Sequence, residues 1–156
     1  MIPDRIEKVR HVVNTILRAQ PDEEQRRFGV THLYGVAQAC ALLALKRGLD
    51  AELGTISGLL HDLWARKSGD PTDHGRRGAV LAREILVDLG CFTESEIAII
   101  CEAIAHHSIK EQVHDVYDEL LKDADVLDHF FYNVLVDPIE KERARLAALW
   151  KELGIE

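Results

Sequence analysis

The sequence predicts an all-α fold. Apolar residues recur at helical spacing in successive segments, helix-capping and helix-stopping residues separate these segments, and no stretch shows the alternating β-branched pattern of a strand. The chain has 156 residues, of which 47% are hydrophobic and 29% charged, enough to build one compact domain with a buried core. We therefore expect a single helical domain over residues 1–156.

The first part of the chain is expected to form three helices. They cover residues 4–20, residues 31–48 after the polar interruption PDEEQ, and residues 51–64. Gly48 is a typical helix stop because glycine readily adopts the left-handed conformation that ends a helix. The third segment is apolar on several sides, which predicts a position near the centre of the bundle.

The second part of the chain begins with a predicted loop. Residues 65–73, ARKSGDPTD, have the composition of a loop, with serine, glycine, proline and aspartate close together. The helices expected after it are residues 74–90 with Asp73 as cap, a segment opened by the capping box Thr93–Glu96, residues 117–136, and residues 137–154 with Asp137 as cap, Pro138 in the first turn and Gly154 as stop.

Charge and cysteine content limit the partners and the compartment. The net charge of -8 disfavours an extended nucleic-acid or anionic-lipid surface, so an anionic substrate needs a local positive centre. Cys40, Cys91 and Cys101 are odd in number and lack CxxC spacing, which indicates free thiols in a reducing compartment. The amino-terminal residues do not resemble a signal peptide, and no apolar run approaches the ~20 residues of a membrane span. We expect a cytoplasmic protein that does not bind membranes.

Histidine and aspartate residues occur on five of the expected helices, mostly near helix ends, where they can meet at one mouth of a bundle. Imidazole nitrogen and carboxylate oxygen together suit divalent Fe, Mn, Co, Ni or Zn, and a metal would supply the positive centre. A lone histidine is more often a surface or hydrogen-bonded residue, and His11, His114 and His129 are assigned to that class. The candidates are His32 opening the second helix, His61 and Asp62 ending the third, His74 opening the fourth, His106 and His107 ending the fifth, and Asp125 inside the sixth.

The order of these residues resembles the HD superfamily. His32 is followed by the pair His61–Asp62 and then by KDADVLD over residues 122–128, and the likeness extends over about residues 30–135. The resemblance implies an HD-domain helical bundle that binds a metal through His32, His61, Asp62 and Asp125. It also implies metal-dependent hydrolysis of a phosphate ester or anhydride in a small molecule, such as a nucleotide or a related compound.

Two further segments resemble HD proteins that bind two metals. They are DHGRRGAVLA and AIAHHS, and the resemblance implies that His74 and His107 hold a second ion, with Asp62 bridging both. His107 is preferred over His106 because it precedes Ser108 as in the matching pattern and continues the apolar stripe of its helix. His106 stays an alternative because helix ends are uncertain by about a turn. One or two ions therefore remain open, and magnesium is also compatible.

The expected chemistry follows from such a centre. Bound water becomes hydroxide near neutral pH while the metal neutralises the phosphoryl oxygens. Asp62 and Asp125 are therefore predicted to be catalytic as well as metal-binding, and Lys122 is predicted to contact a substrate phosphate. Asp128 either orients a ligand or lies on the surface. The cations that flank the ligands are phosphate contacts or solvated charges; they are Arg66, Lys67, Arg76 and Arg77.

Some features leave the function open. Ala65 stands where many catalytic HD proteins carry Lys or Glu, and no GYP signature follows His107, which disfavours cyclic di-nucleotide cleavage. Phosphomonoesterase, phosphodiesterase and pyrophosphohydrolase activities remain open, as do a di-iron oxygenase built on the same ligands and a non-catalytic nucleotide-binding regulatory module. Trp150, on the apolar face of the last helix, either packs in the core or forms a homodimer contact.

Overall fold

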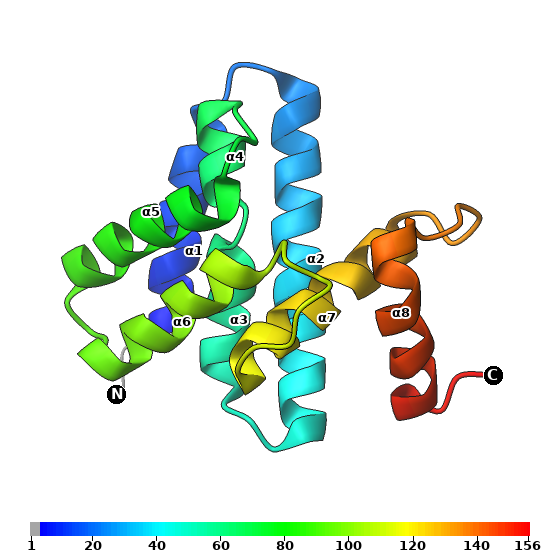
Figure 1. Cartoon of the computed structure of the whole chain (residues 1–156). Helices are drawn as coiled ribbons and strands as arrows, with labels where there is room; N and C mark the ends of the chain where they lie inside the picture. Colours follow the sequence, from blue (N-terminus) through cyan, green and yellow to red (C-terminus); the bar gives the residue numbers. More distant parts are fainter. Residues whose placement is uncertain (1–3) are drawn as a thin grey trace.

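The computed structural model describes residues 4–156, which form eight α-helices and no strand, confirming the predicted all-α class (Figure 1). The helices are α1 (Arg5–Arg18), α2 (Glu23–Arg47), α3 (Ala51–Leu60), α4 (Leu63–Ser68), α5 (His74–Leu89), α6 (Glu94–His106), α7 (Val116–Tyr132) and α8 (Glu140–Leu153).

The centre of the bundle is the antiparallel pair α2 and α3, and α7 packs across both (Figure 1). Helices α5 and α6 form an antiparallel hairpin on one side of this pair, while α8 packs on α7 at the other side (Figure 1). Every residue of α3 from Leu53 to Leu60 is buried, which confirms its predicted central position. On α8, Trp150 packs edge-on against Phe130 with ring centroids 5.0 Å apart.

Local capping explains most helix ends. Thr93 and Glu96 form the predicted capping box at the start of α6, and the predicted stops Gly48 and Gly154 adopt left-handed conformations with φ of 68° and 69°. The second helix was expected from residue 31, but Asp22 accepts a hydrogen bond from the Gln25 amide at 2.9 Å and starts α2 about two turns earlier.

The earlier start of α2 changes the position of His32. This residue was expected to open its helix, but it lies inside α2 and is buried. Judged by length and composition alone, helix α2 contains a stretch that is long and apolar enough to span a membrane. Its buried residues face the rest of the bundle, as in the central helix of a compact domain, and they include a histidine that an apolar membrane interior would not favour.

Other boundaries differ from the sequence predictions. Part of the expected loop over residues 65–73 belongs to the short helix α4, which ends at the left-handed Gly69. Asp73 does precede α5, but its carboxylate pairs with Arg76 and caps no backbone amide. Helix α7 ends at Tyr132, and α8 begins at Glu140, so residue 137 is not its cap. The apolar residues Val134, Leu135 and Val136 extended the expected helix, but they are exposed in the connection between α7 and α8 and have no core to pack against.

Close helix approach depends on two glycines of the central pair. A Cβ atom on Gly58 of α3 would lie 2.6 Å from the Cα atom of Ala37 on α2. A Cβ atom on Gly35 of α2 would lie 1.9 Å from an oxygen of Asp128 on α7. At Gly58 the helices α2 and α3 therefore approach at a distance that only glycine permits, whereas at Gly35 an added Cβ would displace the Asp128 side chain that contacts His32.

Candidate metal centre

The helices from α2 to α7 position one cluster of histidine and aspartate side chains. His32 lies within α2, His61 and Asp62 form the junction between α3 and α4, and Asp125 lies within α7. The junction bends because Asp62 leaves the helical region, with φ of -109° and ψ of 6°. This bend places the two adjacent side chains at the buried end of α3. His74, the first residue of α5, and His107, the residue after α6, complete the cluster.

Four of these side chains form the first half of the cluster. The Nε2 atoms of His32 and His61 are 3.1 Å apart. Asp62 Oδ2 lies 3.3 Å from His32 Nε2 and 3.8 Å from His61 Nε2, while Asp125 Oδ1 lies 3.5 Å and 3.6 Å from the same two atoms. Two imidazole nitrogens and two carboxylate oxygens therefore surround one point, a donor set suited to a divalent transition metal.

The second half of the cluster uses the other oxygen of Asp62. Asp62 Oδ1 lies 3.2 Å from His107 Nε2 and 3.5 Å from His74 Nε2, and these two nitrogens are 3.2 Å apart. Each oxygen of Asp62 thus faces a different histidine pair, with His32 on one side and His107 on the other. A carboxylate in this position could accept a cation on each of its two sides.

All four histidines point the same nitrogen into the cluster. The Nδ1 atoms of His61, His74 and His107 lie 2.7, 3.0 and 2.7 Å from the backbone carbonyls of residues 58, 71 and 104. A carbonyl oxygen only accepts hydrogen bonds, so each Nδ1 carries the proton and each Nε2 keeps a lone pair. His32 Nδ1 is held by Asp128 Oδ2 at 2.7 Å, the ligand-orienting role that the sequence left open for this aspartate.

The electrostatics of the cluster favour a bound cation. Burial raises the pKa of Asp62, but the neighbouring His61, His107 and His32 outweigh burial and lower that pKa well below its usual range. Burial likewise raises the pKa of Asp125, and nearby cationic groups again reverse the effect. One oxygen of each carboxylate is buried without a hydrogen-bond partner among the described residues. Such anionic oxygens are costly unless a cation compensates them.

The histidines of the first half differ in protonation. Burial lowers the pKa of His61, which keeps its imidazole neutral as a metal ligand must be. Burial also lowers the pKa of His32, but Asp128, Asp62 and Asp125 outweigh it and raise the pKa to about 9.

The neighbouring histidines at the end of α6 face different groups of side chains. His107 is buried and faces Asp62, whereas His106 Nδ1 lies 2.7 Å from Asp118 Oδ2 and its ring stacks on His114 at a centroid separation of 4.1 Å. His106 thus belongs to a separate polar cluster at the start of α7. His107 is the candidate ligand, as the sequence pattern favoured.

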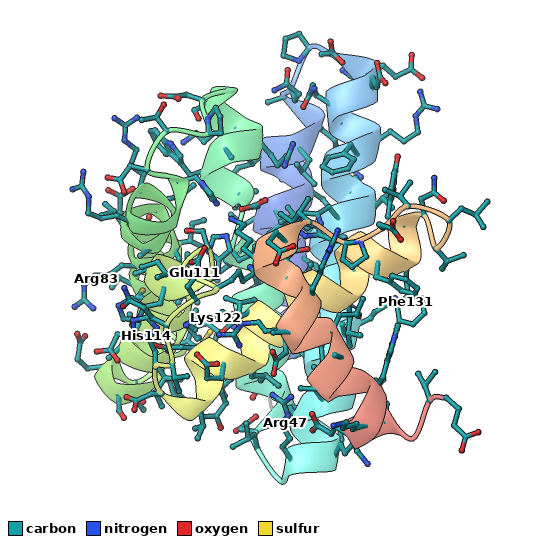
Figure 2. The ribbon with its side chains drawn as sticks, turned by 45° about the vertical axis from the view of Figure 1, so that its right-hand side comes forward. Arg47, Arg83, Glu111, His114, Lys122 and Phe131 are labelled. Carbon is teal, nitrogen blue, oxygen red and sulfur yellow. The ribbon has the colours of Figure 1, made fainter. Side chains whose placement is uncertain are left out.

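Lys122 does not reach the metal centre. It is fully buried, and its ammonium contacts the Gln112 carbonyl at 2.8 Å, His114 Nδ1 at 2.6 Å and Glu119 Oε1 at 2.7 Å. Figure 2 labels Lys122 and His114 near the start of α7, beside the loop that follows α6. These three partners occupy the three donors of the ammonium group, which leaves none for a substrate phosphate. The prediction that Lys122 contacts the substrate is therefore withdrawn.

The basic residues that flank the proposed ligands in the sequence differ in exposure and in their distance from the centre. Arg77 contacts Asp70 at 3.1 Å, and Lys67 is exposed. Arg76, which pairs with the cap-position aspartate of α5, is exposed as well. Arg66 differs because its Nη2 atom lies 3.5 Å from Asp62 Oδ2 and its side chain is only 20% exposed.

Two further residues at the centre were missed by sequence reasoning. The buried Lys110 places its Nζ atom 2.6 Å from Asp125 Oδ2, which leaves Oδ1 as the oxygen facing the histidines. His129 Nε2 lies 3.3 Å from Asp125 Oδ1, and its Nδ1 contacts Glu142 of α8 at 2.9 Å. The spacing of four residues between Asp125 and His129 is a signal that could have identified the histidine. No feature of the sequence around Lys110 indicates that it contacts Asp125.

Comparison with known proteins identifies related sequences and folds. The family model described as HD domain matches residues 29–129. A crystal structure of a predicted HD superfamily hydrolase from an uncultured Thermotogales bacterium is 21% identical to this chain, with a TM-score of 0.63 over 92% of this chain and 88% of that chain. That likeness shows a shared fold. Comparison with curated proteins finds no match.

Proposed function

Because the chain belongs to the HD domain family, we propose that it is a metal-dependent phosphohydrolase that cleaves a small phosphate ester or anhydride, such as a nucleotide. The observation that carries this proposal is the position of Asp62. Its two oxygens lie 3.3 Å from His32 Nε2 and 3.2 Å from His107 Nε2, on opposite sides of one carboxylate. A carboxylate placed in this way suits two ions about 3.5–4 Å apart, the spacing of two-metal phosphohydrolases.

In this proposal the ligands divide between two ions. His32, His61, Asp62 and Asp125 would hold the first, and the second would be held by His74 and His107 together with the bridging carboxylate. Bound ions of this kind supply a water of lowered pKa and neutralise phosphoryl oxygens. Iron, manganese, cobalt, nickel and zinc are all compatible with the nitrogen and oxygen donors.

The protein's own contribution is orientation and charge. The backbone carbonyls and Asp128 keep the imidazole Nε2 atoms pointing into the centre, which reduces the reorganisation needed on binding. Lys110 holds one oxygen of Asp125 and leaves the other free. Asp62 and Asp125 stay anionic, so they would supply negative charge that holds the ions in place.

The decisive experiment combines metal counting with a phosphate ester assay. Gently purified wild-type protein is compared with His74→Ala, His107→Ala and Asp62→Ala, and with His11→Ala as a matched control because this histidine is exposed on α1. Metal per chain is measured by elemental analysis, and hydrolysis is followed by phosphate release from a panel of nucleotides and simple esters, with and without coupling phosphatase.

The expected result is two ions per chain in the wild type and in His11→Ala, about one ion in His74→Ala and His107→Ala, and loss of both metal and hydrolysis in Asp62→Ala. One ion that neither His74→Ala nor His107→Ala removes would instead indicate a mononuclear hydrolase. Metal binding without phosphate release would contradict the phosphohydrolase proposal. Oxygen consumption by the metal-loaded protein would then favour a di-iron oxygenase, and its absence a regulatory module.

A further inference from the structure

We propose that the cavity next to Arg66 binds a planar aromatic group of the substrate, while Arg66 itself contacts the substrate phosphate. This inference rests on the proposed phosphohydrolase function and specifies where its substrate lies. The cavity has a volume of about 450 Å³ and is formed by the amino-terminal half of α2, by α4 and by the end of α7. Its lining includes Glu24, Arg27, Phe28, Thr31, Arg66 and Tyr132.

The cavity adjoins the metal centre at two points. Phe28 lies one helical turn before His32 on α2, and the two rings are stacked with centroids 5.7 Å apart and planes 14° apart. Arg66 lines the cavity and also places its Nη2 atom 3.5 Å from Asp62 Oδ2. A phosphate held at the centre is therefore within reach of Arg66, and the organic group of the same molecule would lie in the cavity.

Arg66 has an oriented guanidinium group with unused donors. The group lies over the Phe28 ring, with its central carbon 4.7 Å from the ring centroid, which restricts its orientation. Its Nε atom is buried without a hydrogen-bond partner among the described residues, and the 3.5 Å contact with Asp62 is too long for a strong hydrogen bond. A buried charged donor without an acceptor is costly, and a phosphate oxygen would supply one in the fork geometry that guanidinium favours.

The aromatic residues determine which organic group fits. Tyr132 packs edge-on against Phe28, with centroids 5.7 Å apart and planes 74° apart, yet its side chain is 65% exposed. An exposed aromatic ring beside a cavity is suited to stacking with a flat ligand. Glu24, Arg27 and Thr31 add hydrogen-bonding groups around the same cavity. The combination favours a heteroaromatic ring, which would present its flat face to Tyr132 and polar atoms at its edge, while Phe28, already packed against His32 and Arg66, positions both Tyr132 and Arg66.

The test compares substrates that share one phosphate ester and differ in the ring. Values of kcat/KM are measured for the ribonucleoside 5′-monophosphates and for ribose 5-phosphate, which lacks the base. Binding of the same compounds to metal-loaded protein is measured in parallel by calorimetry. The variants are Phe28→Leu, Tyr132→Leu and Arg66→Gln. The matched control is Phe131→Leu, because this neighbouring aromatic residue is 58% exposed but lines a different cavity, and Figure 2 shows it at the far end of α7 from Lys122.

The wild type and Phe131→Leu are expected to prefer the best nucleotide over ribose 5-phosphate by roughly 5- to 150-fold, the range for stacking one base. Phe28→Leu and Tyr132→Leu should reduce this preference. Arg66→Gln should lower kcat/KM for both kinds of ester by a similar factor and leave the preference unchanged, with metal content retained. Equal use of nucleotide and ribose 5-phosphate by active wild-type protein would overturn the inference while the phosphohydrolase function stands.

The binding measurement separates the two proposals if turnover is absent. Tighter binding of a nucleotide than of ribose 5-phosphate, lost in Tyr132→Leu but kept in Phe131→Leu, would support the cavity assignment even though the phosphohydrolase function fails. Absence of any binding preference in the wild type would overturn the assignment. A preference that both Phe28→Leu and Tyr132→Leu retain in full would overturn it as well.

Discussion

The contact between α2 and α3 makes Gly58→Ala a sensitive test of the fold around the metal centre. The added Cβ atom would lie 2.6 Å from Ala37 Cα, 2.7 Å from Ala37 N and 3.0 Å from the carbonyl carbon of Val36. All three neighbours are backbone atoms inside a helix, so no side-chain rotation relieves the clash. Helix α2 has to move away from α3.

The size of the effect follows from two opposing terms. Alanine is the better helix former by about 1 kcal/mol. Overpacking in a close-packed interior costs about 1–3 kcal/mol, and a contact with backbone on both sides belongs at the upper end of this range. We therefore expect a net loss of about 2 kcal/mol in the free energy of unfolding. For a chain of this size that corresponds to a fall of roughly 4–8 °C in the midpoint of thermal unfolding.

Thermal and urea unfolding, followed by circular dichroism, measure this loss. Gly54→Ala is the matched control on the same helix, because its Cβ atom would meet chiefly the end of the Leu120 side chain at 3.0 Å, which needs only a small side-chain shift and no movement of a helix. Gly58→Ala should also weaken metal binding by His32 and His61, whose Nε2 atoms are 3.1 Å apart across the same helix contact. If Gly58→Ala were as stable as Gly54→Ala, the argument from backbone contact would be refuted.

Three further predictions concern polar groups near the centre. Asp128→Ala removes the carboxylate that orients His32. Metal affinity, measured by competition with a chelator, should fall about 10- to 100-fold. Unchanged affinity would contradict the orienting role of Asp128. Lys122→Met should lower the free energy of unfolding by about 1–3 kcal/mol, because Glu119 Oε1 and His114 Nδ1 lose the buried ammonium while Arg145 stays on Glu119 Oε2. Metal content should not change. Full stability with lost hydrolysis would restore Lys122 to catalysis. Burial raises the pKa of Glu119, but Arg145, Lys122 and the His114 amide outweigh burial and lower this pKa from 4.5 to about 2. The contribution of Glu119 to stability is therefore present above pH 4.5 and is lost as the pH falls toward 2. Glu119→Gln should flatten the pH dependence of urea unfolding in this window, and an unchanged slope would show that Glu119 is not its source.

Features that depend on neighbours along the chain were predictable from the sequence. The helical class, the stop at Gly48 and the Thr93–Glu96 capping box all arise from contacts within about one turn of helix. The error at the start of α2 occurred because the Asp22 cap, outside the apolar stripe, decides that boundary, whereas α8 begins after Ile139, which provides no side-chain cap that the sequence could reveal. The match of residues 29–129 to the HD domain confirms the family that the order of histidines and aspartates indicated.

Tertiary packing decided which polar groups meet. His32 contacts Asp128, which lies 96 residues away along the chain, and Asp125 contacts Lys110, which lies 15 residues away. Arg145 of α8 joins Glu119 from 26 residues away, at the pair that Glu119 makes with Lys122 on α7. The sequence by itself determined the helices and the set of candidate ligands, because periodicity and motif order are local properties. Only the folded structure selected the partners of each ligand, because hydrogen bonds between distant residues depend on how closely the helices pack.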